Sequence, residues 1–232
     1  MTSVTEQPTA RNRKPVERRV ADGAAVLGGL CTLAACGLIA RDSDVGPLEV
    51  EVFRLVNGLP DALTPVLHGV QYLGVLVVGP IVGLGALALR RYRLGAAALL
   101  VTAGKLVSER IVWTLVVRSR PGTSIADAIV RGTTPASGQS FVSGHVVLTT
   151  GLAWVLTPYL RGRWRILPGL VAAVVAFARL YLGAHAPLDV LGGAGLGAAL
   201  GGAANLIVGV PERDAAGSVR GNQGGDRGVV RE

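Results

Sequence analysis

Three short polar clusters interrupt an otherwise apolar chain of 232 residues. They occupy residues 118–121, 143–145 and 179–189. Their side chains supply guanidinium groups, imidazoles, a carboxylate and a serine hydroxyl beside a glycine, from Arg118, Arg120, Arg179, His145, His185, Asp189, Ser143 and Gly144. These are the residue types that phosphoryl transfer requires, so the clusters are interpreted as parts of one site.

Each residue type in the clusters has a defined use in phosphate chemistry. Arginine binds phosphate oxygens through paired hydrogen bonds and stays charged at any relevant pH. Ser143 and Gly144 stand where an apolar segment begins, and the backbone N–H groups and dipole of a helix N-terminus stabilise an anion. A histidine held by a carboxylate can attack phosphorus, and a second histidine can protonate the leaving oxygen.

The sequence favours chemistry without a metal or cofactor. It contains no cluster of Asp and Glu residues of the kind that holds magnesium. Cys31 and Cys36 do not share a helix face, so we expect neither a disulfide nor a metal site from them. Residues 33–36 are similar to a lipoprotein cleavage box, but the apolar run continues through Ile39, which favours an uncleaved helix.

The composition indicates that the bilayer is the solvent of this chain. Half of the residues are hydrophobic and only 16% are charged, which is too apolar for a soluble domain of this length. The net charge of +8 would suit a nucleic-acid partner, but the basic residues fall at the ends of apolar segments instead of forming one stripe. We therefore expect a membrane lipid phosphate as substrate and no nucleic-acid partner.

Six apolar segments are long enough to cross a hydrocarbon core of about 30 Å. They cover residues 21–40, 62–89, 94–117, 143–160, 166–182 and 187–210. The connectors at residues 90–93 and 161–165 are rich in arginine, and basic connectors stay in the cytoplasm. All three polar clusters then fall on the non-cytoplasmic face of the plasma membrane, while both termini are cytoplasmic.

The sequence thus predicts an all-α polytopic membrane domain over residues 21–210. Residues 1–20 and 211–232 are predicted to be disordered cytoplasmic tails. Residues 41–61 mix charged and apolar side chains and predict an external amphipathic segment between the first two helices. A stripe of small residues that lets a neighbouring helix approach closely consists of Gly193, Gly197 and Gly201.

The clusters resemble the three-part signature of the type-2 phosphatidic acid phosphatase superfamily of membrane lipid phosphatases. The third part, an arginine, five residues, a histidine, three residues and an aspartate, is matched by Arg179, His185 and Asp189. The serine–glycine–histidine of the second part is matched by residues 143–145, and the arginine–proline that ends the first part by residues 120–121. The predicted six-helix topology is similar to that of the family's bacterial members.

The resemblance implies a role for each residue. His185 would attack phosphorus to form a phosphohistidine, Asp189 would orient His185, and His145 would protonate the departing group. The phosphate oxygens would be held by Arg120, Arg179, Ser143 and Gly144.

Three positions depart from the family pattern. The lysine usually found seven residues before the arginine of the first part is Trp113 here, while Val142 and Ala178 replace a proline and a serine. A lost cation weakens phosphate binding unless another replaces it, and we expect Arg118 as the first replacement and Arg110 as the second.

Other ionisable residues lie within the predicted spans. Lys105 and Glu109 are four residues apart, and they fit a self-compensating ion pair as well as a role in substrate binding. His68 is expected to be a packing or hydrogen-bonding residue, because a lone histidine in a membrane helix usually is.

Two other functions stay open at the level of sequence. A non-catalytic protein that binds or transports a lipid phosphate would use the same basic pocket, and a phosphotransferase would use the same catalytic residues. The residues do not identify the lipid: phosphatidic acid, phosphatidylglycerol phosphate, polyprenyl pyrophosphates and polyprenyl phosphosugars all fit. The oligomeric state is also open.

Overall fold

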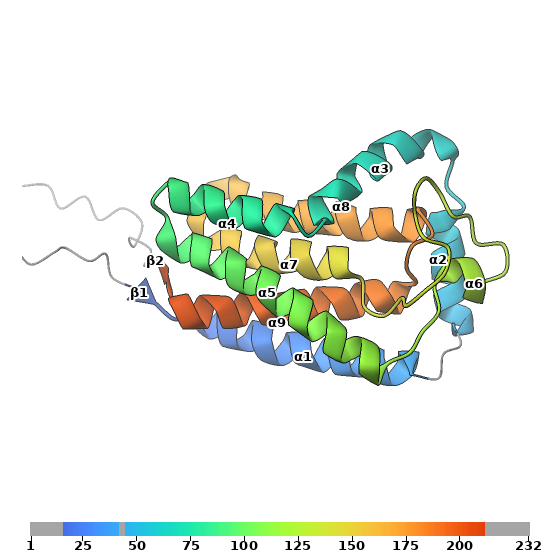
Figure 1. Cartoon of the computed structure of the whole chain (residues 1–232), viewed down its shortest axis with the longest axis horizontal. Coiled ribbons are helices and arrows are strands. Elements are labelled where there is room, and N and C mark those ends of the chain that lie inside the picture. Colours follow the sequence, from blue (N-terminus) through green and yellow to red (C-terminus); the bar gives the residue numbers. More distant parts are fainter. Residues whose placement is uncertain (1–15, 42–44, 212–232) are drawn as a thin grey trace, which may run out of the picture.

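The computed structural model describes residues 16–41 and 45–211, and its long helices lie side by side in one bundle (Figure 1). The helices of the bundle are α1 (Val20–Ala40), α4 (Val78–Ala88), α5 (Tyr92–Leu115), α7 (Gly144–Leu156), α8 (Leu167–Tyr181) and α9 (Pro187–Val208). Short 3₁₀ turns at Thr157–Tyr159 (η3) and Gly162–Ile166 (η4) join α7 to α8. The prediction of an all-α architecture is confirmed for the described chain, apart from two short strands.

Helix α9 lies at the centre of the bundle because its glycines allow close approach on two sides. A Cβ atom on Gly197 would come within 2.8 Å of the Thr150 Cβ on α7. A Cβ atom on Gly195 would come within 2.7 Å of the Gly29 carbonyl oxygen on α1. The predicted packing role is therefore confirmed for Gly197 of the stripe, and Gly195, outside the stripe, allows the close approach of α1.

The second apolar segment, predicted as one helix over residues 62–89, is broken. It consists of α3 (Thr64–Gln71), the 3₁₀ turn η2 (Tyr72–Gly74) and α4, and the two halves are bent by 59°. Figure 1 shows α3 leaning away from the bundle while α4 lies along it. The bend places η2 against the start of α7.

Helix α2 (Pro47–Asn57) lies across one end of the bundle, which we call the site end, together with the short helix α6 (Pro121–Ser124) and the 3₁₀ turn η1 (Asp61–Leu63) (Figure 1). Its buried residues recur every four positions, as in an amphipathic helix, and are Glu49, Phe53 and Asn57. Leu48 and Leu55 are exposed on its other side. The predicted amphipathic segment is thus present, while its external position stays a prediction.

The opposite end of the bundle, the tail end, holds a two-stranded pairing. Strand β1 (Val16–Glu17) pairs antiparallel with β2 (Val210–Pro211). Of the predicted N-terminal tail, residues 16–20 include this strand and the start of α1, while residues 1–15 and 212–232 of the predicted tails lie outside the described residues.

Length and hydropathy qualify three helices as membrane spans. They are Val20–Ala40, Gly162–Tyr181 and Pro187–Val208, and the bent pair of α3 and α4 would make a fourth. Helix α5 carries several charged residues and α7 has only 13 residues, so neither qualifies by this measure, although both lie along the bundle (Figure 1). Six spans therefore stay a prediction.

Candidate active site

The ends of the loop between α5 and α7 are hydrogen-bonded to each other. The backbone N–H of Ser140 donates to the Arg118 carbonyl at 2.8 Å, and Ser119 forms a bridge with Gln139. The Gln139 side chain also donates to the carbonyl of Val116. This closure brings the first polar cluster next to the second, although more than twenty residues separate them in sequence.

The turn between α8 and α9 brings the third cluster to the same place. The N–H groups of Ala184 and His185 both donate to the Arg179 carbonyl, at 3.0 and 3.3 Å, so the turn folds back over the end of α8. Gly183 has φ +72°, a conformation that glycine adopts without strain. The Ser143 N–H donates to the Asp189 carbonyl at 3.0 Å, which joins the second cluster to the third.

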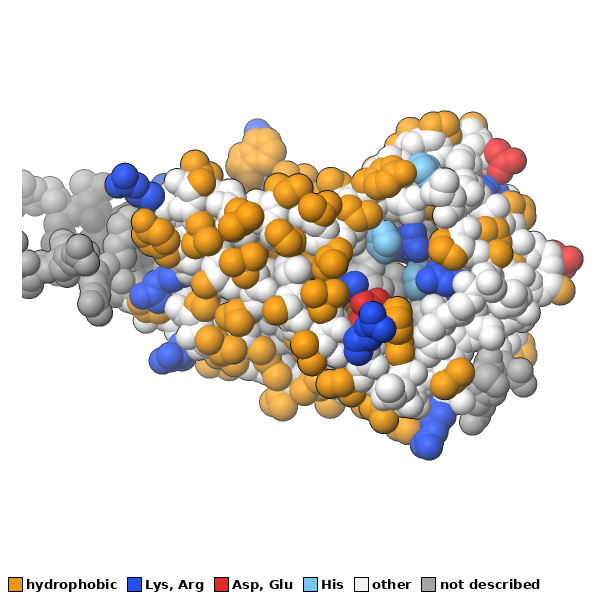
Figure 2. Space-filling view, viewed as in Figure 1, with side chains coloured by type: hydrophobic (Ala, Val, Ile, Leu, Met, Phe, Trp, Pro, Cys, Tyr) orange, Lys and Arg blue, Asp and Glu red, His pale blue; other side chains and the backbone are white. Residues whose placement is uncertain are grey.

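A cavity of about 340 Å³ lies where the clusters meet, between η2, α5, α7 and the end of α8. Figure 2 shows histidine and basic side chains gathered in a hollow near the site end. The predicted site residues that line the cavity are His145, His185, Arg120, Arg179 and Gly144. Five of the eight predicted residues are thus brought to one surface.

The Asp189 carboxylate lies behind the His185 ring. The ring Nδ1 lies 3.7 Å from Asp189 Oδ2, and the Ser140 hydroxyl, which donates to the same Oδ2 at 2.5 Å, lies 3.5 Å from Nδ1. Asp189 Oδ2 also accepts the Ala186 N–H at 2.8 Å, as a carboxylate near a helix start does. With Nδ1 on the Asp189 side, the Nε2 atom is left for the cavity.

The position of His185 favours its neutral form. Only 3% of the residue is exposed, and burial lowers its pKa to about 4, with Asp189 opposing this shift and Arg179 adding to it. A neutral imidazole keeps the lone pair that a nucleophile needs. The lowered pKa thus leaves the imidazole unprotonated at neutral pH.

Arg120 and Arg179 bring positive charge to the cavity. Within the described residues neither forms an ion pair with a carboxylate: Arg120 donates to the Ala184 carbonyl at 3.0 Å, and Arg179 donates to the side chain of Gln71. Burial lowers the pKa of Arg120, and the charges of Asp189 and Glu109 oppose that shift. The Arg179 Nε atom is buried without a hydrogen-bond partner. Arg179 is buried and Arg120 half-buried, and guanidinium groups without counterions in such positions are suited to bind an anion.

His145 lies in the first turn of α7, directly after Gly144. Because α7 begins at the cavity, the free N–H groups of its first turn face the cavity. Ser143 was expected to bind phosphate oxygens, but it does not line the cavity. Its N–H donates to the Asp189 backbone carbonyl, and its buried hydroxyl has no hydrogen-bond partner. Gly144 is thus the residue of this pair that lines the cavity.

Residues 93–211, about half of the chain, match the sequence profile of the PAP2 superfamily. The protein belongs to the PAP2 superfamily. No curated protein sequence matches the chain.

Two solved structures have the same fold as this protein. LpxE from Aquifex aeolicus is 24% identical with a TM-score of 0.64, and the match covers 68% of this chain and 95% of that one. A transmembrane PAP2-type phosphatidylglycerolphosphate phosphatase from Bacillus subtilis is also 24% identical, with a TM-score of 0.57, and the match covers 81% of this chain and 95% of that one.

Arg118, expected among the substrate-binding residues of this PAP2 protein, does not line the cavity. Only 1% of it is exposed, and its guanidinium donates to Asp189 Oδ1 at 3.0 Å and to both carboxylate oxygens of Glu49. Burial disfavours its charge, but the hydrogen bonds and charges of Glu49 and Asp189 outweigh burial and raise the pKa of Arg118. Arg118 is therefore committed to two carboxylates and is not available to replace the missing family lysine.

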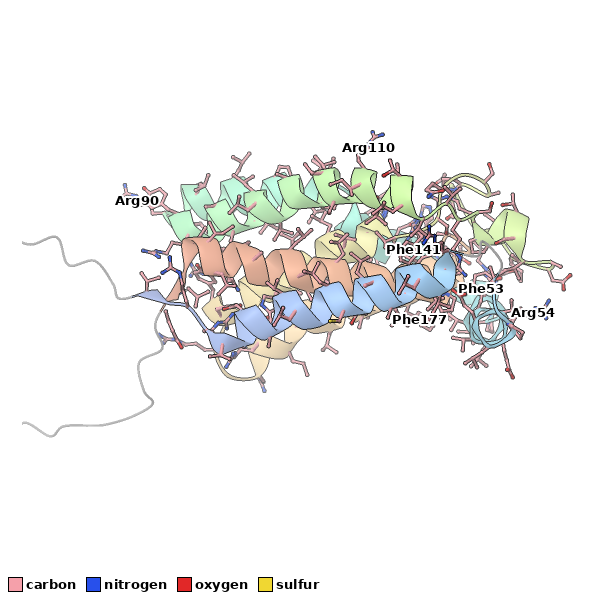
Figure 3. The ribbon with its side chains drawn as sticks, turned by 90° about the horizontal axis from the view of Figure 1, so that it is seen from below. Phe53, Arg54, Arg90, Arg110, Phe141 and Phe177 are labelled. Atoms are coloured by element: carbon pink, nitrogen blue, oxygen red, sulfur yellow. The ribbon has the colours of Figure 1, made fainter. Side chains whose placement is uncertain are left out.

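The other charged residues near the missing lysine are also placed by the structure. Trp113 lines the cavity, so the family position itself faces the site. Arg110, the second expected replacement, is exposed and points away from the helices (Figure 3). Lys105 and Glu109 form the expected ion pair at 2.6 Å, and both line the cavity. Lys105 is thus the additional cation at this PAP2 site, with Glu109 as its partner.

The sequence did not predict three residues whose side chains contact the predicted site residues, and one of them, Gln71, itself lines the cavity. Glu49, Ser140 and Gln71 contact Arg118, Asp189 and Arg179 respectively. A signal existed for Glu49, since a charged residue shares the apolar face of an amphipathic helix with Phe53 only when it has a buried partner. Ser140 and Gln71 carry no such signal. His68 does not line the cavity and contacts the Thr133 hydroxyl at 3.3 Å.

Proposed function

We propose that this PAP2 protein is an integral membrane lipid phosphate phosphatase that hydrolyses a phosphomonoester or pyrophosphate of a membrane lipid through a phosphohistidine at His185. One observation carries the proposal. A buried neutral histidine with a carboxylate behind it shares a cavity with two arginines that have no carboxylate partner among the described residues. The cavity therefore offers a nucleophile and the charge that a phosphoryl group needs.

In the first step His185 Nε2 attacks phosphorus and the bond from phosphorus to the lipid oxygen breaks. Asp189 stabilises the positive charge that develops on the ring, as a carboxylate behind a catalytic histidine does. His145 gives a proton to the departing oxygen. The products of this step are a phosphohistidine and the free lipid alcohol, or the lipid monophosphate when the substrate is a pyrophosphate.

In the second step water attacks the phosphohistidine. His145, which has lost its proton, accepts one from the water, and the nitrogen–phosphorus bond breaks to release inorganic phosphate. Arg120 and Arg179, with the N–H groups at the start of α7, hold the phosphate oxygens through both steps. The enzyme returns to its starting state without any change of oxidation state.

The chemistry of the lining side chains supports a reaction without a metal. Within residues 16–41 and 45–211, no group of three or more His, Cys, Asp or Glu side chains is placed to hold a metal ion. Arginines take the place that a metal would have as the neutraliser of phosphate charge. The single carboxylate that lines the cavity, Glu109, is already paired with Lys105.

The distribution of basic residues supports a site on the non-cytoplasmic face. The connector at residues 90–93 lies at the tail end, where Arg93 donates to the Val208 carbonyl at the end of α9. Figure 2 shows basic side chains at that end, and the second basic connector, between α7 and α8, contains Arg163 and Arg165 of η4. Basic connectors stay in the cytoplasm, so the site end faces outward. Substrates would then be presented by the outer leaflet of the plasma membrane.

A phosphate-release assay in EDTA tests the proposal. Purified protein is given phosphatidic acid, phosphatidylglycerol phosphate or a polyprenyl pyrophosphate in mixed micelles, and inorganic phosphate is measured. We expect release by the wild type and by His68→Ala, whose histidine lies outside the cavity, and none by His185→Ala. Binding without turnover would indicate a binding or transport protein. Transfer of phosphate to an added alcohol with no release to water would indicate a phosphotransferase.

A further inference from the structure

Glu49, on helix α2, lies outside the cavity but contacts residues that border the catalytic carboxylate. Its carboxylate accepts hydrogen bonds from both terminal nitrogens of the Arg118 guanidinium, with Nη1 to Oε1 at 3.0 Å, and from the Leu188 N–H at 2.8 Å. Leu188 stands next to Asp189 in the first turn of α9. Glu49 is only 8% exposed, so these bonds are shielded from water.

Arg118 carries the contact from Glu49 to the catalytic carboxylate. Its Nη1 atom donates to Glu49 Oε1 and to Asp189 Oδ1, both at 3.0 Å. Asp189 Oδ2, the other oxygen, faces His185. A buried arginine between two carboxylates holds both in a fixed orientation. If either carboxylate moved away, a buried charge would be left without a partner, which is costly.

The other end of α2 forms uncharged hydrogen bonds to the loop between α5 and α7 and to the end of α8. The Asn57 side chain donates to the carbonyls of Ile129 and Tyr181, at 2.8 and 2.9 Å, and accepts the Ile129 N–H at 2.8 Å. Asn57 is buried, like Glu49, and lies two turns further along the same face. It contacts no catalytic side chain and therefore serves as a matched control for a purely structural role.

We propose that Glu49 is a positioning residue of the active site, which fixes Arg118 so that Arg118 holds the Asp189 carboxylate against His185. The inference rests on the proposed function, because it assigns Glu49 to the reaction of the same histidine. Glu49 does not line the cavity, so it acts on the chemical step and not on substrate binding. The catalytic centre of this chain thus extends from α9 to the amphipathic helix at the site end (Figure 1).

The electrostatic consequence has a definite sign. Replacing Glu49 by Gln removes one negative charge from the chain of groups behind His185, so the protonated ring is stabilised less and the His185 pKa falls. This variant leaves the other charged or titratable groups around the His185 ring unchanged. These groups are Asp189, Arg179, Arg120, His145, Lys105 and Glu109. Removing the positive charge of Arg118 would instead raise the His185 pKa.

The experiment combines histidine titration with kinetics. The chain has three histidines, so ring ¹H–¹³C signals of labelled protein in micelles can be assigned and titrated by NMR. For Glu49→Gln we expect the His185 pKa to fall by about half a unit, less than a direct partner would cause. We expect kcat to fall roughly 10- to 100-fold, the range over which outer partners of an oriented histidine act, with KM within about twofold. Asn57→Ala should lower the melting temperature without moving the His185 pKa.

A double variant keeps the test decisive if Glu49→Gln does not fold. In E49Q/R118M both buried charges are removed together, and because Arg118 is nearer to Asp189 than Glu49 is, the His185 pKa should rise above that of the wild type. An unchanged His185 pKa in Glu49→Gln, or a loss of kcat that Asn57→Ala reproduces, would overturn the proposal. A raised KM with unchanged kcat would do the same. A wild type that releases no phosphate would instead refute the proposed function, and the titration would still decide the role of Glu49.

Discussion

Gly74 lies directly against the His145 side chain, so closely that a Cβ atom on Gly74 would come within 2.7 Å of the His145 Cβ. The bend between α3 and α4 brings these two residues together from different helices. The proposed proton donor is therefore positioned by a glycine that belongs to no motif.

Gly74→Ala should displace His145 and lower kcat, by about tenfold or more, since small misplacements of catalytic groups are costly. The loss should be smaller for an aryl phosphate than for a lipid phosphate, because an aryl oxygen leaves with less need of a proton. Gly69→Ala is the control, since a Cβ atom on Gly69 meets nothing within 4 Å. Equal losses for both substrates would contradict a role of Gly74 through His145.

The two histidines should differ in the step at which their variants fail. His185→Ala cannot form the phosphoenzyme, so its loss should be the largest of any single substitution. His145→Ala should lose about 10²- to 10⁴-fold, with a smaller loss for good leaving groups. Rapid quench with radiolabelled substrate measures acid-labile, base-stable phosphate on the protein. Label that persists in His185→Ala and disappears in His145→Ala would reverse the two assignments.

The two cavity arginines should matter far more than an exposed one. Arg120→Ala or Arg179→Ala removes a desolvated contact to the transferring group, which is worth several kcal/mol, whereas an exposed charge contributes about 0 to 1 kcal/mol. The comparison is kcat/KM against that of Arg110→Ala, whose side chain points away from the bundle (Figure 3). Comparable values for the three variants would refute the proposed phosphate site.

The buried position of His185 predicts an unusual pH profile. Because its pKa is lowered to about 4, the ring stays neutral and reactive as the pH falls below the ordinary histidine value, and it becomes protonated only near pH 4. Once kcat/KM is divided by the ionised fraction of the substrate, the acid limb should lie near pH 4. A limb near pH 6.5 would mean that the ring is solvated in the working enzyme.

The proposed orientation can be checked by labelling with an impermeant thiol reagent. In a background lacking Cys31 and Cys36, Asp127→Cys should react in intact cells, because the Asp127 side chain is 83% exposed at the site end. Arg161→Cys, next to η4, should react only after lysis. The reverse pattern would place the site in the cytoplasm.

Local sequence determined the parts of the site that lie within a few residues of one another. Pro187 begins α9 and Asp189 follows in its first turn, so the carboxylate reaches back to the Ala186 N–H and lies beside His185. The apolar segments and basic connectors were readable because hydropathy and charge are properties of short windows. The family signature depends on the same short spacings, and the family match confirms it.

Tertiary structure alone decided which charged residues face the cavity. Arg118 and Arg120 are two positions apart and have the same chemistry, yet Arg118 is turned inward by Glu49, 69 residues away, while Arg120 lines the site. Lys105 lines the cavity and Arg110 does not, because the packing of α5 against its neighbours fixes which face of the helix is turned to the site. A charged side chain is buried only where a partner compensates its charge, and the partner of Arg118, Glu49, lies in a distant part of the sequence.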